Sequence, residues 1–184
     1  MCIRDRSYMD PESKQKGISV AKSPYKQYKN PNWSNYKITG TYVNSIVALQ
    51  DAVAKGADEA LILDNDGYIS EGSGENIFFL KDGLIMTPTT KNCLNGITRQ
   101  SVIEIAKDLG HKVEEGDWSY EHIIDCDEAF FTGTAVEVTP ITKIDEKIIS
   151  NGTVGSITEE IQTSYENAVL GTDNNSRNWL TYIK

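Results

Sequence analysis

The sequence has little cysteine and little histidine. Its three cysteines, Cys2, Cys93 and Cys126, are far apart and form no CxxC pair, and only two histidines occur in 184 residues. A disulfide framework needs an even set of cysteines, and a zinc site needs closely spaced cysteine or histidine ligands. The sequence therefore supports neither of them. We expect reduced thiols, a cytoplasmic location and no bound metal.

The chain also lacks a long apolar run and a basic face. No stretch approaches the roughly 18 apolar residues that a membrane helix requires. The formal net charge is −9, whereas proteins that bind the phosphate backbone of nucleic acids usually carry a basic patch. Lysines cluster only between Lys14 and Lys37, which we interpret as a solvated arm. The composition thus argues against a membrane protein and against a nucleic-acid partner.

The first six residues, "MCIRDR", are not followed by the apolar stretch of an export signal. They match the translation of a transposon end that is used in sequencing libraries. We therefore interpret residues 1–6 as adapter-derived, and we expect the native gene to begin upstream. On this interpretation the chain is a fragment.

The next part of the chain, residues 7–36, is polar and irregular apart from the strand-like "GISVA". We predict an incoming strand there, followed by an arm. Between Gly40 and Gly56, apolar residues recur at helical spacing, and Gly56 supplies a stop. An amphipathic helix is predicted, with this series at helical spacing, apolar except for Gln50: Val43, Ile46, Val47, Gln50, Val53 and Ala54.

Two hairpins are predicted after this helix. The stretches "EALILD" and "YIS" flank "NDG", and the two apolar halves of "NIFFLKDGLIMTP" flank "KDG". A glycine that follows an aspartate between two apolar runs is a strong signal for a tight turn that joins antiparallel strands.

The second half of the chain mixes helices and strands. A helix is predicted from Thr98 to a cap at Gly110, then a strand near Val113, a helical turn in "SYEHIID", strands in "EAFFTGT" and "EVTPITKID", and a helix from Ser156 to Leu170. Because strands and helices do not strictly alternate, a doubly wound parallel sheet is disfavoured. We predict a mixed α/β (α+β) fold in which helices pack on a barrel-like mixed or antiparallel sheet.

Four small polar stretches interrupt the apolar pattern: "NYKITGTYVNS", "SEGSGEN", "LNGITR" and "FFTGTAVE". Taken singly, each has an ordinary structural explanation. A lysine before a helix is usually solvated, carboxylates in a turn usually face water, and the other two stretches are usually a cap and a turn. Together, in this order and spacing, they resemble the large domain of the class IV aminotransferases. This family is the fold-type IV group of pyridoxal-phosphate enzymes, and within it the resemblance is to the branched-chain amino acid aminotransferases.

The resemblance runs from about Gly17 to Trp179, and it implies pyridoxal 5'-phosphate as the cofactor. Lys37 matches the family's Schiff-base lysine, which also moves a proton at the substrate. Glu71 matches the carboxylate that pairs with the pyridine nitrogen of the cofactor. Small neighbours such as Gly72 and Gly74 are expected to let the backbone approach the cofactor closely.

The remaining matches concern the cofactor's phosphate and ring oxygen and the substrate. Ile97 and Thr98, at the start of a helix, match a phosphate site, because a helix start offers unpaired N–H groups. Thr134 matches a second phosphate donor, and the backbone from Gly133 to Ala135 matches the part that receives the substrate carboxylate. Tyr42 matches the phenol that binds the ring oxygen, and Glu75 and Asn76 are expected to support the site.

The resemblance implies transfer of an amino group from leucine, isoleucine or valine to 2-oxoglutarate by a ping-pong route, as in branched-chain amino acid biosynthesis. It also implies a homodimer or higher homo-oligomer. The family carries a smaller N-terminal domain that this sequence does not match. We therefore expect residues 37–184 to form the cofactor-binding large domain, and the fragment alone to have little activity.

Three alternatives stay open from the sequence. D-amino acid aminotransferase and aminodeoxychorismate lyase share the lysine and the glutamate, although the "GTA" of "FFTGTAVE" favours the branched-chain enzyme. The third, from another class, is a non-catalytic barrel domain that serves binding or assembly.

Overall fold

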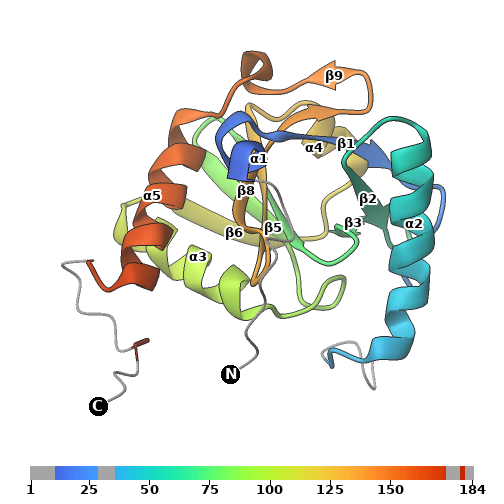
Figure 1. Ribbon diagram of the computed structural model, residues 1–184, viewed down its shortest axis with the longest axis horizontal. Helices are drawn as coiled ribbons and strands as arrows, with labels where there is room; N and C mark the ends of the chain where they lie inside the picture. The colour runs from blue at the N-terminus through green and yellow to red at the C-terminus, as the bar shows by residue number, and fades with distance from the viewer. Residues whose placement is uncertain (1–10, 29–35, 173–178, 181–184) are drawn as a thin grey trace.

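The computed structural model describes residues 11–28, 36–172 and 179–180. Residues 1–6, which we interpret as adapter-derived, lie outside these ranges, as does part of the predicted arm. Within the described ranges, no helix combines the length and the apolar character needed to cross a membrane. The described chain is built on one curved, nine-stranded sheet that is covered by helices (Figure 1).

The sheet is mixed, with strand order β3-β2-β1-β8-β7-β4-β5-β6 and β9 paired to β8. β1 runs parallel to both of its neighbours, and β5 runs parallel to β6, whereas the other pairs are antiparallel. The strands are β1 (Ile18–Lys22), β2 (Glu59–Leu63), β3 (Ile69–Glu71), β4 (Asn76–Lys81), β5 (Leu84–Pro88), β6 (Lys112–Gly116), β7 (Glu128–Gly133), β8 (Glu137–Ile144) and β9 (Lys147–Ile148).

Three longer helices cover the outer face of the sheet. α3 and α5 pack against each other and against β7, while α2 packs on β2, on the other side of the molecule in Figure 1. The helical segments are α1 (Pro11–Lys16), α2 (Tyr42–Ala54), α3 (Ile97–Asp108), α4 (Tyr120–Ile124) and α5 (Ser156–Leu170), with two 3₁₀ turns, η1 (Thr39–Thr41) and η2 (Ser150–Gly152).

The core follows from the alternation of side chains along the strands. In β4, Ile77 and Phe79 point to the inner face, where they join a cluster that includes Phe131. Phe78 points outward and stacks on Phe130 at 5.1 Å between ring centroids, beneath α3 and α5. Both faces of the central strands are thus buried, which explains why the sequences of these strands are continuous apolar runs.

The predicted fold class is confirmed, as are both hairpins and the helices at 42–54, 97–108 and 156–170. The short elements α1 and β9 carry no periodicity long enough to predict them. The incoming strand, β1, lies between β2 and β8 and so belongs to the same sheet as the rest of the described chain.

The orientation of α2 differs from what its apolar series suggests. Val43, Ile46 and Val53 are 66%, 54% and 58% exposed, whereas the buried residues of the helix are Ser45, Ala48 and Ala52. Ala48 and Ala52 pack with Ala21, Ala60 and Ile62 of β1 and β2. The small side chains of the helix therefore face the sheet, and Val43, Ile46 and Val53 do not.

Glu128 at the start of β7 fixes the start of α5. Its carboxylate accepts the backbone N–H of Ile157 (3.2 Å) and of Thr158 (2.8 Å), and the Thr158 hydroxyl (2.7 Å). Gly155 leaves the room for this contact, because a Cβ there would lie 2.0 Å from the Glu128 carboxyl carbon. The carboxylate thus satisfies N–H groups that every helix leaves open at its start.

We expect Glu128→Ala to lower the free energy of unfolding by about 2–3 kcal/mol, because charged hydrogen bonds are lost at a helix start and a buried hydroxyl loses its partner. Urea titration followed by circular dichroism measures this loss. Glu146→Ala is the matched control, since the Glu146 side chain is 99% exposed. Equal stability of the two variants would contradict this function of Glu128.

Candidate active site

Strand register brings the four polar stretches of the sequence to one place. β4 begins at Asn76, the last residue of "SEGSGEN", and β7 ends in "TG" of "FFTGTAVE". The two strands are antiparallel with Asn76 opposite Thr132, so the two stretches meet at the same edge of the sheet. The start of α3 packs near the end of β7, and the segment before α2 completes the arrangement.

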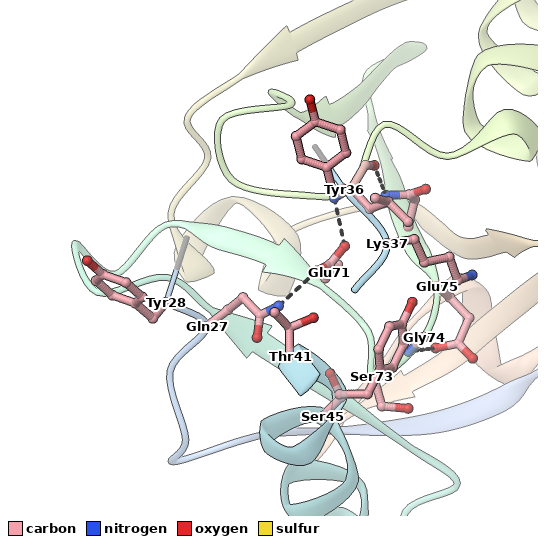
Figure 2. A pocket seen from close by; sticks show the side chains of 13 residues that line it. Gln27, Tyr28, Tyr36, Lys37, Thr41, Ser45, Glu71, Ser73, Gly74 and Glu75 are labelled. Atoms are coloured by element: carbon pink, nitrogen blue, oxygen red, sulfur yellow. Dashed lines mark hydrogen bonds between the residues drawn. The ribbon is translucent and has the colours of Figure 1, made fainter. Parts of the chain in front are cut away.

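A pocket lies where these segments meet. Two adjoining hollows share Lys37, Gly74, Asn76 and Leu94 as lining residues, and we call them together the central pocket. Among the residues predicted from the sequence, all but Gly72 and Ala135 line it: Lys37, Tyr42, Glu71, Gly74, Glu75, Asn76, Ile97, Thr98, Gly133 and Thr134. Figure 2 shows how Lys37, Glu71 and Glu75 surround one part of it.

Lys37 precedes the 3₁₀ turn η1 and lines both hollows of the central pocket. Its amine lies 5.9 Å from the ring centroid of Tyr42, the first residue of α2, within the range of a cation–π contact. Both side chains therefore reach the pocket from the same turn of the chain. The arrangement presents an exposed primary amine and a phenol to the same space.

Glu71, at the end of β3, is held from two sides. One carboxylate oxygen accepts the side-chain amide of Gln27 at 3.1 Å (Figure 2). The other accepts the backbone N–H of Leu94 at 2.9 Å. Gln27 is itself fixed, since its backbone N–H donates to Leu63 O and Asn44 donates to its side-chain oxygen. The carboxylate of Glu71 thus has a defined orientation at the pocket wall.

The start of α3 has open backbone donors. Gly96 is the residue before the first helical turn and gives no side-chain cap, and no acidic residue lies in that turn. Gly96 also sits against Asn76, because a Cβ there would lie 2.3 Å from Asn76 Oδ1. Asn76 in turn donates to Leu94 O at 2.7 Å. Thr98 is buried at this helix start, whereas Ile97 is 82% exposed.

The end of β7 adds hydroxyls and small residues to the opposite wall. Thr132 is fully buried, and its hydroxyl has no hydrogen-bond partner among the described residues. Gly133 and Thr134 follow it, and Thr134 is exposed to the pocket. A helix start with open N–H groups beside several hydroxyls is a set of donors suited to a phosphate group.

The two glycines of "SEGSGEN" differ in what they permit. A Cβ at Gly72 would lie 2.8 Å from Glu75 Oε2 and 2.9 Å from the Phe131 ring, so Gly72 allows the turn to pack on the core. Close approach to a ligand, which the sequence suggested for Gly72, is therefore not the reason for this glycine. Gly74 lines the pocket with open space around it, as that expectation requires.

Two further glutamates lie buried beneath this turn. Glu59 is 2% exposed and Glu75 is 4% exposed. Burial, followed by the charge of Glu59, raises the pKa of Glu75 to about 8, while the Gly74 N–H and the Lys37 charge oppose this rise. Burial likewise raises the pKa of Glu59. Burial therefore favours the protonated form of Glu75.

Sequence reasoning did not find Gln27, Leu94 and Glu59 as parts of this region. Gln27 lies in the irregular arm, Leu94 contributes only a backbone N–H, and Glu59 begins an apolar strand. None of these positions has a motif or a spacing that marks it, because each acquires its partner only when distant segments pack. The described residues contain no group of three or more histidine, cysteine or acidic side chains placed to bind a metal.

Comparison with known families connects this pocket to a group of enzymes. Residues 2–144 match the sequence profile described as "Amino-transferase class IV". This chain belongs to the class IV aminotransferase family. The match includes Lys37, Glu71 and Thr98, so the pocket is assembled largely from residues of the family's own domain.

Members of this family with similar sequences and structures are branched-chain amino acid aminotransferases. The Pseudomonas aeruginosa enzyme of that name is 44% identical over 179 residues, which are 97% of this chain and 58% of the relative. The crystal structure of the Escherichia coli enzyme superposes with a TM-score of 0.92 at 34% identity, covering 97% of this chain and 59% of that one. The Thermobaculum terrenum enzyme, solved in its PLP-form, superposes with a TM-score of 0.88 at 34% identity, covering 94% of this chain and 57% of that one. This chain thus spans a little over half the length of these relatives.

Proposed function

We propose that this chain carries the cofactor-binding part of a pyridoxal 5'-phosphate-dependent branched-chain amino acid aminotransferase. The observation that carries the proposal is the convergence of Lys37, Glu71 and the uncapped start of α3 on one pocket. The names of the relatives support the substrate class, and the "GTA" sequence at 133–135 favours the branched-chain enzyme within the family.

The donors of the central pocket fit this cofactor. Lys37 offers an amine for an aldehyde, Glu71 offers an oriented carboxylate for a ring nitrogen, and Tyr42 offers a phenol for a ring oxygen. The open N–H groups of α3, with Thr98 and Thr134, suit the phosphate. The Thr132 hydroxyl, which is buried without a partner in the described chain, marks a place where a polar ligand atom would be accepted.

When bound, pyridoxal phosphate supplies an electron sink for the bonds at the substrate α-carbon. Lys37 would bind the cofactor covalently through its Nζ, and its amine would later move a proton at the α-carbon. Glu71 would keep the ring nitrogen protonated, because an anion beside it favours the charged form. The backbone from Gly133 to Ala135 would receive the substrate carboxylate.

We expect a protein of the relatives' full length, with the segment upstream of this chain in place, to convert leucine and 2-oxoglutarate to the branched 2-oxo acid and glutamate. Coupled detection of glutamate measures the turnover, and parallel lines in double-reciprocal plots would indicate the ping-pong route. The 184-residue chain alone is expected to give little product. If leucine is not turned over, and the protein instead cleaves aminodeoxychorismate or transaminates D-alanine, one of the two alternatives within the family would replace this proposal.

A non-catalytic barrel domain would give a different result. Incubation with pyridoxal phosphate, reduction with borohydride and peptide mass spectrometry are expected to locate the label on Lys37. A label spread over surface lysines, with no preference for Lys37, would favour the non-catalytic alternative.

The same proposal extends to organisation and location. We propose residues 37–184 as the large, cofactor-binding domain, with β1 contributed by the preceding segment. A homodimer or higher homo-oligomer and a cytoplasmic location are proposed for the complete enzyme.

A further inference from the structure

The buried glutamates beneath "SEGSGEN" have no function in the chemistry proposed above. Glu59 lies at the start of β2 and Glu75 lies immediately before β4, 16 residues later in the sequence. Their carboxyl groups are held beneath the same turn, because Glu59 accepts from Ser73 and Glu75 accepts from the next residue, Gly74. A hydrogen bond between two carboxyl groups requires a proton between them, because two carboxylates have only acceptors.

Glu59 accepts more hydrogen bonds from its surroundings than Glu75 does. This difference favours a proton on one of the two carboxyl groups. Glu59 accepts the Ala60 N–H at 2.6 Å, the Ser73 N–H at 3.2 Å and the Ser73 hydroxyl at 2.9 Å. Glu75 accepts the Gly74 N–H at 2.9 Å (Figure 2). Because hydrogen bonds from N–H and O–H groups stabilise an anion, these donors favour the negative charge on Glu59 and the proton on Glu75.

This pair supports the turn that carries Glu71. Ser73 and Gly74, which donate to the two carboxyl groups, form the middle of the turn, and the Gly72 N–H closes it by donating to Glu75 O at 2.8 Å. Glu71 leads directly into this turn. A change in the distance between the two carboxyl groups would therefore move the turn and with it Glu71.

We propose that Glu59 and Glu75 share one proton, and that the resulting hydrogen bond is a positioning device that orients Glu71 toward the central pocket. The proposal rests on the proposed function only for what Glu71 binds. Loss of the proton leaves two adjacent buried anions, with Glu71 as a third negative group and Lys37 as the cation that faces them. The pair then repels, and the turn loses its fixed geometry.

Glutamate carboxyl signals of the ligand-free chain, observed by ¹³C NMR, test the shared proton. One carboxyl is expected to titrate near pH 8, and this titration is expected to disappear in Glu75→Gln. The Gln amide can donate to Glu59 while its oxygen still accepts the Gly74 N–H, so the variant preserves both contacts. Glu114→Gln, on the exposed strand β6, is the matched control and should leave the titration unchanged.

The backbone N–H signal of Leu94, which donates to Glu71 Oε2, tests the positioning. It is expected to shift with the same midpoint in the unmodified chain and to stay constant in Glu75→Gln. Absence of any glutamate titrating above its ordinary range would overturn the shared proton. If the Leu94 N–H signal does not change while the glutamate titrates, the proposed coupling between the pair and Glu71 would be overturned. Both readouts are independent of cofactor binding and turnover, so they do not depend on whether the proposed function is correct.

Stability supplies a second measurement should Glu75→Gln fold poorly. The folded pKa of Glu75, about 8, lies above the ordinary value of 4.5. The stabilisation by the bound proton is therefore complete below pH 4.5 and is lost as the pH rises through 8. We expect the folded fraction of the unmodified chain at a fixed urea concentration to fall across this window. A folded fraction that stays constant over the same window would contradict the proposal.

Discussion

Replacing Lys37 with alanine in the complete enzyme is expected to abolish transamination, with turnover reduced by at least about 10⁴-fold, because the covalent attachment and the proton transfer are lost together. The amine is exposed to the pocket and contributes no packing in the core. The fold should therefore be unaffected, and circular dichroism and the urea midpoint should match those of the unmodified protein.

Two further variants separate charge from chemistry. Lys37→Arg keeps the positive charge near Tyr42 and Glu75 but removes the primary amine, so it should be as inactive as the alanine variant. Lys55→Ala removes an exposed lysine beyond the opposite end of α2, where it pairs with Asp51 at 2.6 Å, and should retain full turnover. Substantial turnover in Lys37→Arg or Lys37→Ala would show that another group performs this chemistry.

Glu71→Gln is expected to retain covalent attachment of the cofactor at Lys37 but to lower turnover by about 10²–10³-fold, as does the loss of one oriented electrostatic partner in other enzymes. The amide is close in shape to the carboxylate, and its oxygen can still accept the Leu94 N–H. Its NH₂ group then faces the side-chain amide of Gln27, so the hydrogen bond that Gln27 donates to Glu71 is lost. A neutral amide, however, does not stabilise a protonated ring nitrogen as a carboxylate does.

Rapid-mixing absorbance of the first half-reaction with leucine measures this effect directly. The slow step should be the proton transfer, which a kinetic isotope effect on leucine deuterated at the α-carbon identifies. Glu114→Gln again serves as the control for an exposed glutamate. If Glu71→Gln reacts as fast as the unmodified enzyme, Glu71 does not pair with the ring nitrogen.

The local elements were predictable because their signals are local. The aspartate–glycine turns at 66–67 and 82–83 predict two hairpins, and both form, with Gly67 and Gly83 at positive φ. Apolar spacing likewise predicts α3 and α5, whose helical period depends only on neighbouring residues. The matched motifs further indicate the residues of the site, and all of these except Gly72 and Ala135 line one pocket.

Other features follow only from tertiary packing. The sequence determines that residues 42–54 form a helix, but the buried face is the one with Ala48 and Ala52, because the adjoining surface of β2 accepts small side chains. The place of β1 between two parallel neighbours depends on strand register, which no local pattern specifies. The contact of Gln27 with Glu71 spans 44 residues of sequence, so only the folded chain brings that pair together. The same holds for the proton of Glu75, because the burial and the neighbouring charge that retain it exist only when β2 and the turn before β4 have packed.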